Sequence, residues 1–101
     1  METRSPENEK QIDLEQLRFE INNCDESMSK SLAERMKLIP LVAKYKKDNN
    51  IERYQPNREQ QVIDTRKKLA EELGLNPDLA EKIMKLIIED AHRIEIGIIG
   101  K

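Results

Sequence analysis

The sequence predicts an all-α fold with three helices per chain, one long and two shorter, that assemble into a helical homodimer. Three observations predict it. Apolar residues recur at three- and four-residue steps, prolines and glycines fall where helices should begin and end, and no stretch alternates apolar and polar residues as a strand would. With 101 residues and a hydrophobic content of 37%, a single copy can bury little apolar surface.

The first helix is predicted over about residues 13–48. Its apolar stripe consists of Leu14, Leu17, Ile21, Cys24, Met28, Leu32, Ile39 and Val42. Pro40 removes one backbone hydrogen bond, so we expect a bend near it. A helix of this length extends about 50 Å at 1.5 Å per residue. The two shorter helices cannot cover such a stripe, so we expect a second protomer to pack against it.

Boundary residues define the two shorter helices. Pro56 suits a first helical position, where no N–H is needed, so the second helix is predicted from there to Leu73. Gly74 suits the left-handed position after a helix end. Asn76 followed by Pro77 reads as a cap and a first-turn proline, which starts the third helix. The inward residues are predicted to be Val62, Ile63, Leu69, Ala70 and Leu73 in the second helix, and Leu79, Ala80, Ile83, Met84, Ile87, Ile88 and Ala91 in the third.

Composition excludes several function classes. A net charge of -2 argues against a general nucleic-acid binder. No apolar run approaches the roughly 20 residues that span a membrane. One cysteine, Cys24, excludes an intrachain disulfide and fits a reducing cytoplasm. One histidine, expected on a solvated helix face, makes a metal site improbable. We expect a cytoplasmic protein with a flexible polar tail at 1–12, a domain at 13–96 and a short frayed tail at 97–101.

Four charged residues lie on or beside the apolar stripes, where apolar residues are expected. Arg35 lies seven residues from Met28 along the first helix, and Lys46 follows 11 residues later, about 16 Å along the axis. Arg58 opens the second helix, and Glu95 follows Ala91 by one turn in the third. Burying an unpaired charge is costly, and an internal salt bridge explains any one of these residues alone. Three cations against one carboxylate leave an excess that favours an anionic ligand.

Arg18 adds a geometric constraint. It precedes Arg35 by 17 residues, which is about 25 Å along one helix. The two side chains can share a site only if Arg18 comes from another chain. Two long helices packed antiparallel would supply it in this way.

Three segments carry a resemblance to a known family. The stretch LEQLRFEINNCDESMSKSLAERMKLIPLVAKYKK resembles the first helix of the all-helical chorismate mutases, in which Leu-Ala-Glu-Arg is followed by a lysine one helix-length later. YQPNREQQV resembles the start of that family's second helix, with its Arg-Glu dipeptide, and LIIEDAHRIE resembles its third helix. The ordered set spans about residues 13–96, and its order and spacing make the resemblance specific.

The resemblance implies an intertwined dimer that rearranges chorismate to prephenate, on the way to phenylalanine and tyrosine. Arg35 would bind the enolpyruvyl carboxylate, Arg58 would lie near the other acidic end, and Arg18 of the partner subunit would hold one carboxylate. The reaction is an intramolecular pericyclic shift, so it needs no nucleophile, metal or cofactor. The arginines would instead hold a flexible dianion in a chair-like conformer.

The resemblance also implies how the breaking bond is stabilised. Lys46 would donate a hydrogen bond to the ether oxygen, where negative charge develops in the transition state, and Glu95 would face that oxygen from the opposite side. Glu59 would help to hold the ring hydroxyl. An ionised Glu95 can only accept a hydrogen bond and would repel the developing charge. We therefore expect it to act protonated, and activity to fall as pH rises.

The sequence departs from the family's commonest pattern in three places. Gln55 stands where many members carry an aspartate beside the ring hydroxyl. Ala91 replaces a frequent serine, and Glu95 replaces the more usual glutamine. These positions are nevertheless expected to line the substrate site.

Two other functions fit the same residues. A related all-helical enzyme, isochorismate-pyruvate lyase, forms salicylate with a nearly identical set of cations. A non-catalytic helical dimerisation module would share the composition, although it would not need these charges on inner faces. Such domains are also often fused to other enzymes of the aromatic pathway.

Overall fold

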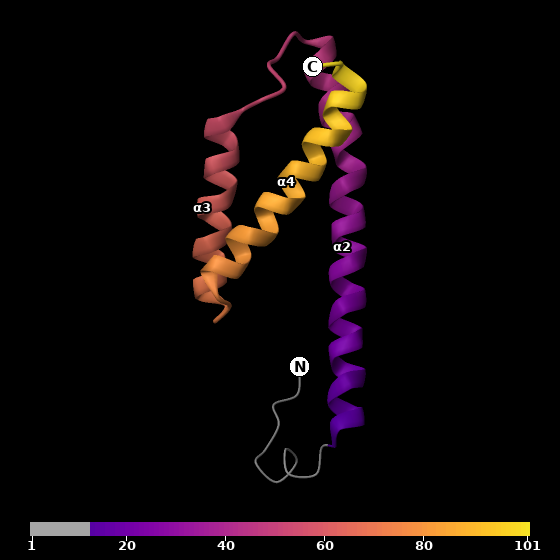
Figure 1. Cartoon of the computed structure of the whole chain (residues 1–101), viewed down its shortest axis with the longest axis vertical. Helices are drawn as coiled ribbons and strands as arrows, with labels where there is room; N and C mark the ends of the chain where they lie inside the picture. The colour runs from indigo at the N-terminus through magenta and orange to yellow at the C-terminus, as the bar shows by residue number, and fades with distance from the viewer. Residues whose placement is uncertain (1–12) are drawn as a thin grey trace. The chain divides into compact units, whose positions relative to one another are not determined.

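The computed structural model describes residues 13–101, and in that range the chain is entirely helical and loop (Figure 1). Its helices are α2 (Leu14–Asp48), α3 (Pro56–Glu72) and α4 (Pro77–Ile99). The predicted all-α fold of one long and two shorter helices is confirmed. The described part of the chain divides into two units, one that ends at Arg35 and one from Met36 to Lys101, and each is described by itself. The tail predicted at 1–12 lies outside the described residues.

Helix α2 is continuous for 35 residues, including Pro40. Asp13 caps its start, because its carboxylate accepts a hydrogen bond from the backbone N–H of Gln16 at 2.9 Å. The predicted apolar stripe is present but uncovered. Between residues 14 and 35 no side chain is buried, and Leu14 and Met28 are 58% and 63% exposed.

The helix boundaries in the second unit follow the predicted residues. Pro56 occupies the first turn of α3, and Gly74 adopts the left-handed conformation, with φ at 74°. Asn76 caps α4, because its side-chain oxygen accepts a hydrogen bond from the backbone N–H of Asp78 at 2.9 Å. Helices α3 and α4 are therefore joined by a tight turn, and they pack against each other (Figure 1).

The end of α4 differs from the prediction. Residues 97–99 are helical rather than frayed, and the helix ends at Gly100, whose φ of 90° is left-handed and whose N–H donates to the Ile96 carbonyl at 2.8 Å. An interior glycine such as Gly97 weakens a helix by only about 1 kcal/mol relative to alanine. The half-buried side chains of Ile98 and Ile99, together with the glycine cap, stabilise this last turn.

Alanines make up most of the buried apolar core of the second unit. The buried apolar residues are Ala43, Val62, Ile63, Ala70, Ala80 and Ala91. Leu69 and Leu73, predicted to face inward, are 46% and 71% exposed. Of the other predicted inward positions of α4, none is fully buried, and Leu79 and Ile83 are 45% and 43% exposed. A single helix–helix contact covers only one narrow strip of each partner, so the flanking leucines and isoleucines stay accessible. None of the helices in the described range is long and apolar enough to cross a bilayer.

An ion-pair bridge joins the surfaces of α3 and α4. The Glu81 carboxylate accepts hydrogen bonds from Lys85 at 2.7 Å and from Lys67 at 2.9 Å. These bonds, first from Lys85 and then from Lys67, lower the pKa of Glu81 to about 2. The same contact with Glu81 raises the pKa of Lys67. This bridge lies near the start of α4. The last turns of α4, at the opposite end of the helix, reach the end of α2 (Figure 1).

Candidate active site

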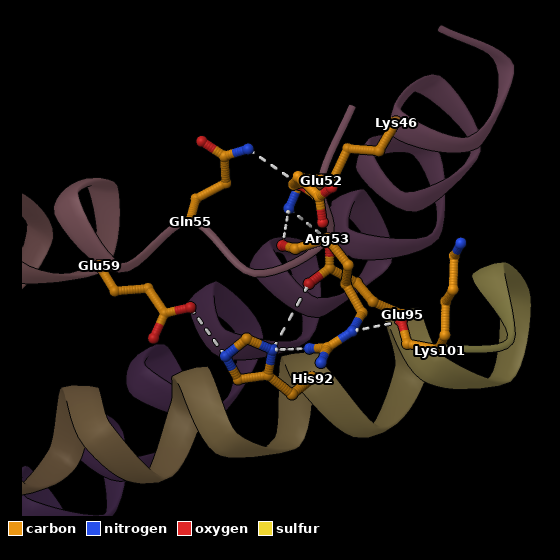
Figure 2. Close-up of polar contacts among 8 residues, drawn as sticks. All are labelled: Lys46, Glu52, Arg53, Gln55, Glu59, His92, Glu95 and Lys101. Atoms are coloured by element: carbon orange, nitrogen blue, oxygen red, sulfur yellow. Dashed lines mark hydrogen bonds and ion pairs between the residues drawn. The ribbon is translucent and has the colours of Figure 1, made fainter. Parts of the chain in front are cut away.

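The last turns of α2 and α4 meet through a buried ion pair. The ammonium of Lys46 lies 2.9 Å from the carboxylate oxygen Oε1 of Glu95, and the two side chains are 16% and 7% exposed (Figure 2). Both residues were predicted to belong to one site, and the structure brings them together. The contact is also an internal salt bridge, the alternative explanation that the sequence offered for a charge on an apolar face.

The connecting loop after α2 holds Lys46 from the other side. Its ammonium donates a second hydrogen bond to the backbone carbonyl of Arg53 at 2.8 Å. The backbone of Ile51 folds back at the same point and donates to the carbonyl of Lys46 at 2.9 Å. Lys46 is thus fixed at a junction of three chain segments, the end of α2, the loop and α4. An ammonium has three donors, so this lysine retains the capacity for one more acceptor.

Beside this pair, His92 links α4 to α3 and to the loop (Figure 2). Its Nε2 lies 2.8 Å from the carboxylate of Glu59, and its Nδ1 is hydrogen-bonded to the guanidinium of Arg53. The Nδ1 atom is also 4.0 Å from the second carboxylate oxygen of Glu95. The Arg53 side chain donates further to the main-chain oxygen of Lys101 at 2.7 Å. These contacts form one polar network around Lys46.

The other predicted residues of the second unit take different places. Gln55 is half-buried at the start of α3 and donates to the Glu52 carbonyl at 2.9 Å. Ala91 is buried on α4, next to His92. Arg58 is exposed, and its guanidinium donates to the side chain of Gln61 at 3.0 Å. The structure therefore joins Glu59 and Glu95 to Lys46 through the network but leaves Arg58 outside it.

Arg18 and Arg35 belong to the first unit. Arg18 is 62% exposed and lies 3.7 Å from Glu15, one turn earlier on the same helix. Arg35 is half-buried. Their predicted roles toward a substrate remain predictions.

His92 and Arg53 were not predicted as site residues, and the expectation of a solvated face for His92 is wrong. Its side chain is only 22% exposed, because Glu59 and Arg53 cover both ring nitrogens. Helical spacing carried a signal for it, since His92 lies three residues before Glu95 and four after Ile88 on one face of α4. Arg53 lies in a loop, where no periodicity indicates which way a side chain points.

An open cavity of about 590 Å³ lies on the loop side of Lys46. The residues that line it include the basic residues Lys46, Lys47, Arg53 and Lys101 and the acidic residue Glu52. With Lys46 already paired to Glu95, three basic residues and one acidic residue remain, a balance that favours a small, negatively charged ligand. Within residues 13–101, no three acidic, histidine or cysteine side chains gather as a metal site would require.

A comparison with protein families decides the assignment. A family model described as chorismate mutase type II matches residues 17–96. The chain belongs to the chorismate mutase type II family. The match includes Lys46, Glu59, His92 and Glu95, which form the network, and it confirms the resemblance found in the sequence. The predicted class of enzyme, an isomerase of aromatic amino acid biosynthesis, is that of this chorismate mutase family.

Two curated proteins also resemble this chorismate mutase domain. The T-protein of Enterobacter agglomerans is 31% identical over 83 residues, and the T-protein of Haemophilus influenzae is 29% identical over 82 residues. The alignments cover 82% and 81% of this chain. The chain spans only 22% of the length of each T-protein, so the comparison concerns one part of those longer proteins.

Proposed function

We propose that this chain catalyses the rearrangement of chorismate to prephenate. The observation that carries the proposal is the Lys46 ammonium, held 2.9 Å from Glu95 within the segment that matches the chorismate mutase family. A fixed ammonium stabilises negative charge on the ether oxygen as the C–O bond breaks, and this interaction is stronger in the transition state than in the ground state. The basic residues along the adjoining cavity support an anionic substrate.

The ion pair with Glu95 defines what must happen when substrate binds. An ionised Glu95 neutralises part of the charge that Lys46 presents and would repel the ether oxygen. A dianion placed beside Glu95 would disfavour its ionised form. Proton uptake by Glu95 would free the ammonium for the substrate and give the carboxyl group a proton to donate. Catalysis by this pair therefore requires the protonated form of Glu95.

The carboxylates of the substrate are assigned to arginines. Arg58 is one residue before Glu59 in the first turn of α3, and its exposed side chain can leave Gln61 at little cost to bind an anion. Arg35 is proposed to bind the enolpyruvyl carboxylate. Guanidinium groups suit this task, because each binds a carboxylate through two parallel hydrogen bonds.

A second copy of the chain is proposed to complete the site. Along α2, the apolar side chains Leu14, Leu17, Ile21, Met28 and Leu32 are each more than 40% exposed, which a second long helix would cover. Arg18 is about 25 Å from Arg35 along α2, so it would reach the site of the partner subunit. An isologous dimer of this kind contains two equivalent sites. Fusion to further enzymes and a cytoplasmic location remain predictions.

Lysine variants test the proposal directly. Lys46→Ala should lower kcat/KM for chorismate by about 100-fold or more, the usual effect of removing one donor to a developing oxyanion. Lys44→Ala is the matched control, because Lys44 lies on the same helix, is 71% exposed and pairs with the exposed Asp48. Chorismate disappearance and prephenate formation are followed together. Equal activity of the two variants would contradict the role of Lys46.

The substrate assay also separates the competing functions. Isochorismate is assayed beside chorismate, with salicylate and pyruvate as the products sought. Turnover of isochorismate alone would replace the mutase proposal with the lyase. No turnover of either substrate by a folded dimer would favour a non-catalytic dimerisation module.

A further inference from the structure

We propose that His92 is a positioning residue, which in one neutral tautomer holds both Glu59 and Arg53 and thereby sets the position of Lys46. The inference rests on the proposed function, because the position of Lys46 matters to turnover only if the chain acts on chorismate. The contacts themselves are independent of that function. They join α4, α3 and the loop at a single imidazole ring (Figure 2).

The ring is held on three sides. Its Nε2 lies 2.8 Å from the Glu59 carboxylate, and its Nδ1 is hydrogen-bonded to Arg53. The ring of Tyr54 packs edge-on, with 5.9 Å between ring centroids and 61° between planes. With 22% of the side chain exposed, water has limited access to compete for either nitrogen.

The donors and acceptors permit one placement of the proton. A guanidinium has only donors, so the Nδ1 atom facing Arg53 must accept. A neutral imidazole then carries its proton on Nε2 and donates it to the carboxylate of Glu59. The other tautomer would place N–H against N–H at Arg53 and a lone pair against a carboxylate at Glu59. The hydrogen-bond network thus assigns the tautomer.

The contact with Arg53 connects His92 to Lys46. The Arg53 side chain is anchored by His92 and by the main-chain oxygen of Lys101, while its own carbonyl accepts the Lys46 ammonium at 2.8 Å. Releasing the guanidinium from His92 would loosen the backbone that holds Lys46. Displacement of a catalytic donor by about 1 Å is enough to lower a rate substantially.

Protonation of His92 would break this arrangement. An imidazolium has two N–H donors, so it cannot accept from Arg53, and the two cations repel each other. The charged groups facing the ring are Glu59 from α3, Arg53 from the loop and Glu95 from its own helix, and Lys46 from α2 pairs with Glu95. The carboxylate of Glu59 would keep its contact in either state. The imidazolium form would therefore release Arg53 selectively.

Nuclear magnetic resonance of the imidazole tests the network without any substrate. His92 is the only histidine of the chain, so the ¹⁵N spectrum of histidine side chains contains one ring. At alkaline pH we expect the Nε2–H tautomer, with Nδ1 unprotonated. Replacement of Arg53 by Gln removes the obligatory donor and should allow a mixture of tautomers. An Nδ1–H tautomer, or an equal mixture in the unmodified chain, would overturn the inference.

Turnover by three variants tests the consequence for the site. His92→Phe keeps the ring and the Tyr54 contact but removes both polar contacts, and kcat/KM should fall by about 10- to 100-fold, as expected for losing hydrogen bonds to charged groups. His92→Gln can still donate to Glu59 through its amide N–H and accept from Arg53 through its amide oxygen, so it should retain more activity than His92→Phe. Arg93→Gln, on the exposed face of α4, is the control. Equal rates for His92→Phe and Arg93→Gln would overturn the inference. An unmodified chain without turnover would refute the proposed function instead, while the tautomer measurement would still decide the network.

Discussion

Replacing Glu95 with Gln separates the stabilising contact of this side chain from its proposed chemistry. In the structure the carboxylate is 7% exposed and accepts a hydrogen bond from Lys46, which is itself 16% exposed. A glutamine amide keeps an oxygen acceptor for Lys46 but removes the opposite charge. Removing one partner of a buried ion pair costs about 3–5 kcal/mol, and the hydrogen bond that the amide keeps with the charged ammonium offsets about 1.5–3 kcal/mol, so Glu95→Gln should destabilise the fold by about 1–3 kcal/mol. For a domain of this size, each 1 kcal/mol shifts Tm by roughly 4–8 °C.

The same substitution should improve the chemistry at alkaline pH. A catalytic group that must be protonated loses about tenfold in rate per pH unit once it ionises. The amide of Gln donates to the ether oxygen at any pH, so kcat/KM of the variant should stay flat where that of the unmodified chain declines. The variant is thus expected to be less stable and yet, at high pH, more active.

The two effects are measured on one preparation. Chorismate disappearance is followed from about pH 5 to about pH 9, the range in which an acid–base limb is resolved, and thermal unfolding is recorded at neutral pH. Glu89→Gln, an exposed change on the same helix, is the control and should alter neither quantity. Superimposable pH profiles for the unmodified chain and Glu95→Gln would remove Glu95 from the chemistry. A variant with unchanged Tm would show that the ion pair adds no net stability.

Three further predictions concern the dimer, the acid stability and the end of α4. If the partner subunit supplies Arg18, mixing inactive Arg18→Ala and Arg35→Ala chains should restore about a quarter of the activity, because each heterodimer contains one intact site. If each site instead used Arg18 and Arg35 of the same chain, mixing would restore no activity. The pKa of Glu81 is about 2 in the folded chain against 4.5 unfolded, so its ionised form stabilises the fold above about pH 4.5. This contribution is lost as pH falls toward about 2. Glu81→Gln should therefore remove that part of the acid dependence of stability in chemical unfolding. Gly97→Ala, with open space around the new methyl group, should stabilise α4 by about 0.5–1 kcal/mol in thermal melts. Gly100→Ala should destabilise the helix, because φ at this position is 90°. Equal effects of the two variants would contradict the assigned helix end.

Local signals were sufficient for the helices because helix boundaries depend on nearby residues. Pro56, Gly74 and the Asn76 cap act within one turn of the chain, and the structure has all three where they were predicted. The end of α4 was misjudged because two glycines suggested fraying. Gly100 instead forms the left-handed cap, and Gly97 lies within a helix whose neighbours compensate for it.

The ion pair of Lys46 with Glu95 could be anticipated in part. A charged residue on the apolar face of a helix is costly to bury alone, so the sequence indicated that Lys46 and Glu95 needed partners. The family resemblance placed both residues at one site. The pattern of residues could not show that each is the partner of the other in the unliganded chain. That depends on where the last turns of two helices meet, 49 residues apart in the sequence.

The helical fold and the family were determined by the sequence alone, because periodicity and spacing are properties of the chain itself. Tertiary structure decided the network of His92, Arg53 and Glu59, whose atoms come from α4, the loop and α3. It also decided that Arg58 stays outside that network. The direction of a side chain in a loop or at a helix start depends on the hydrogen-bond donors and acceptors that tertiary packing brings within about 3 Å of it. No local sequence pattern specifies which groups these will be.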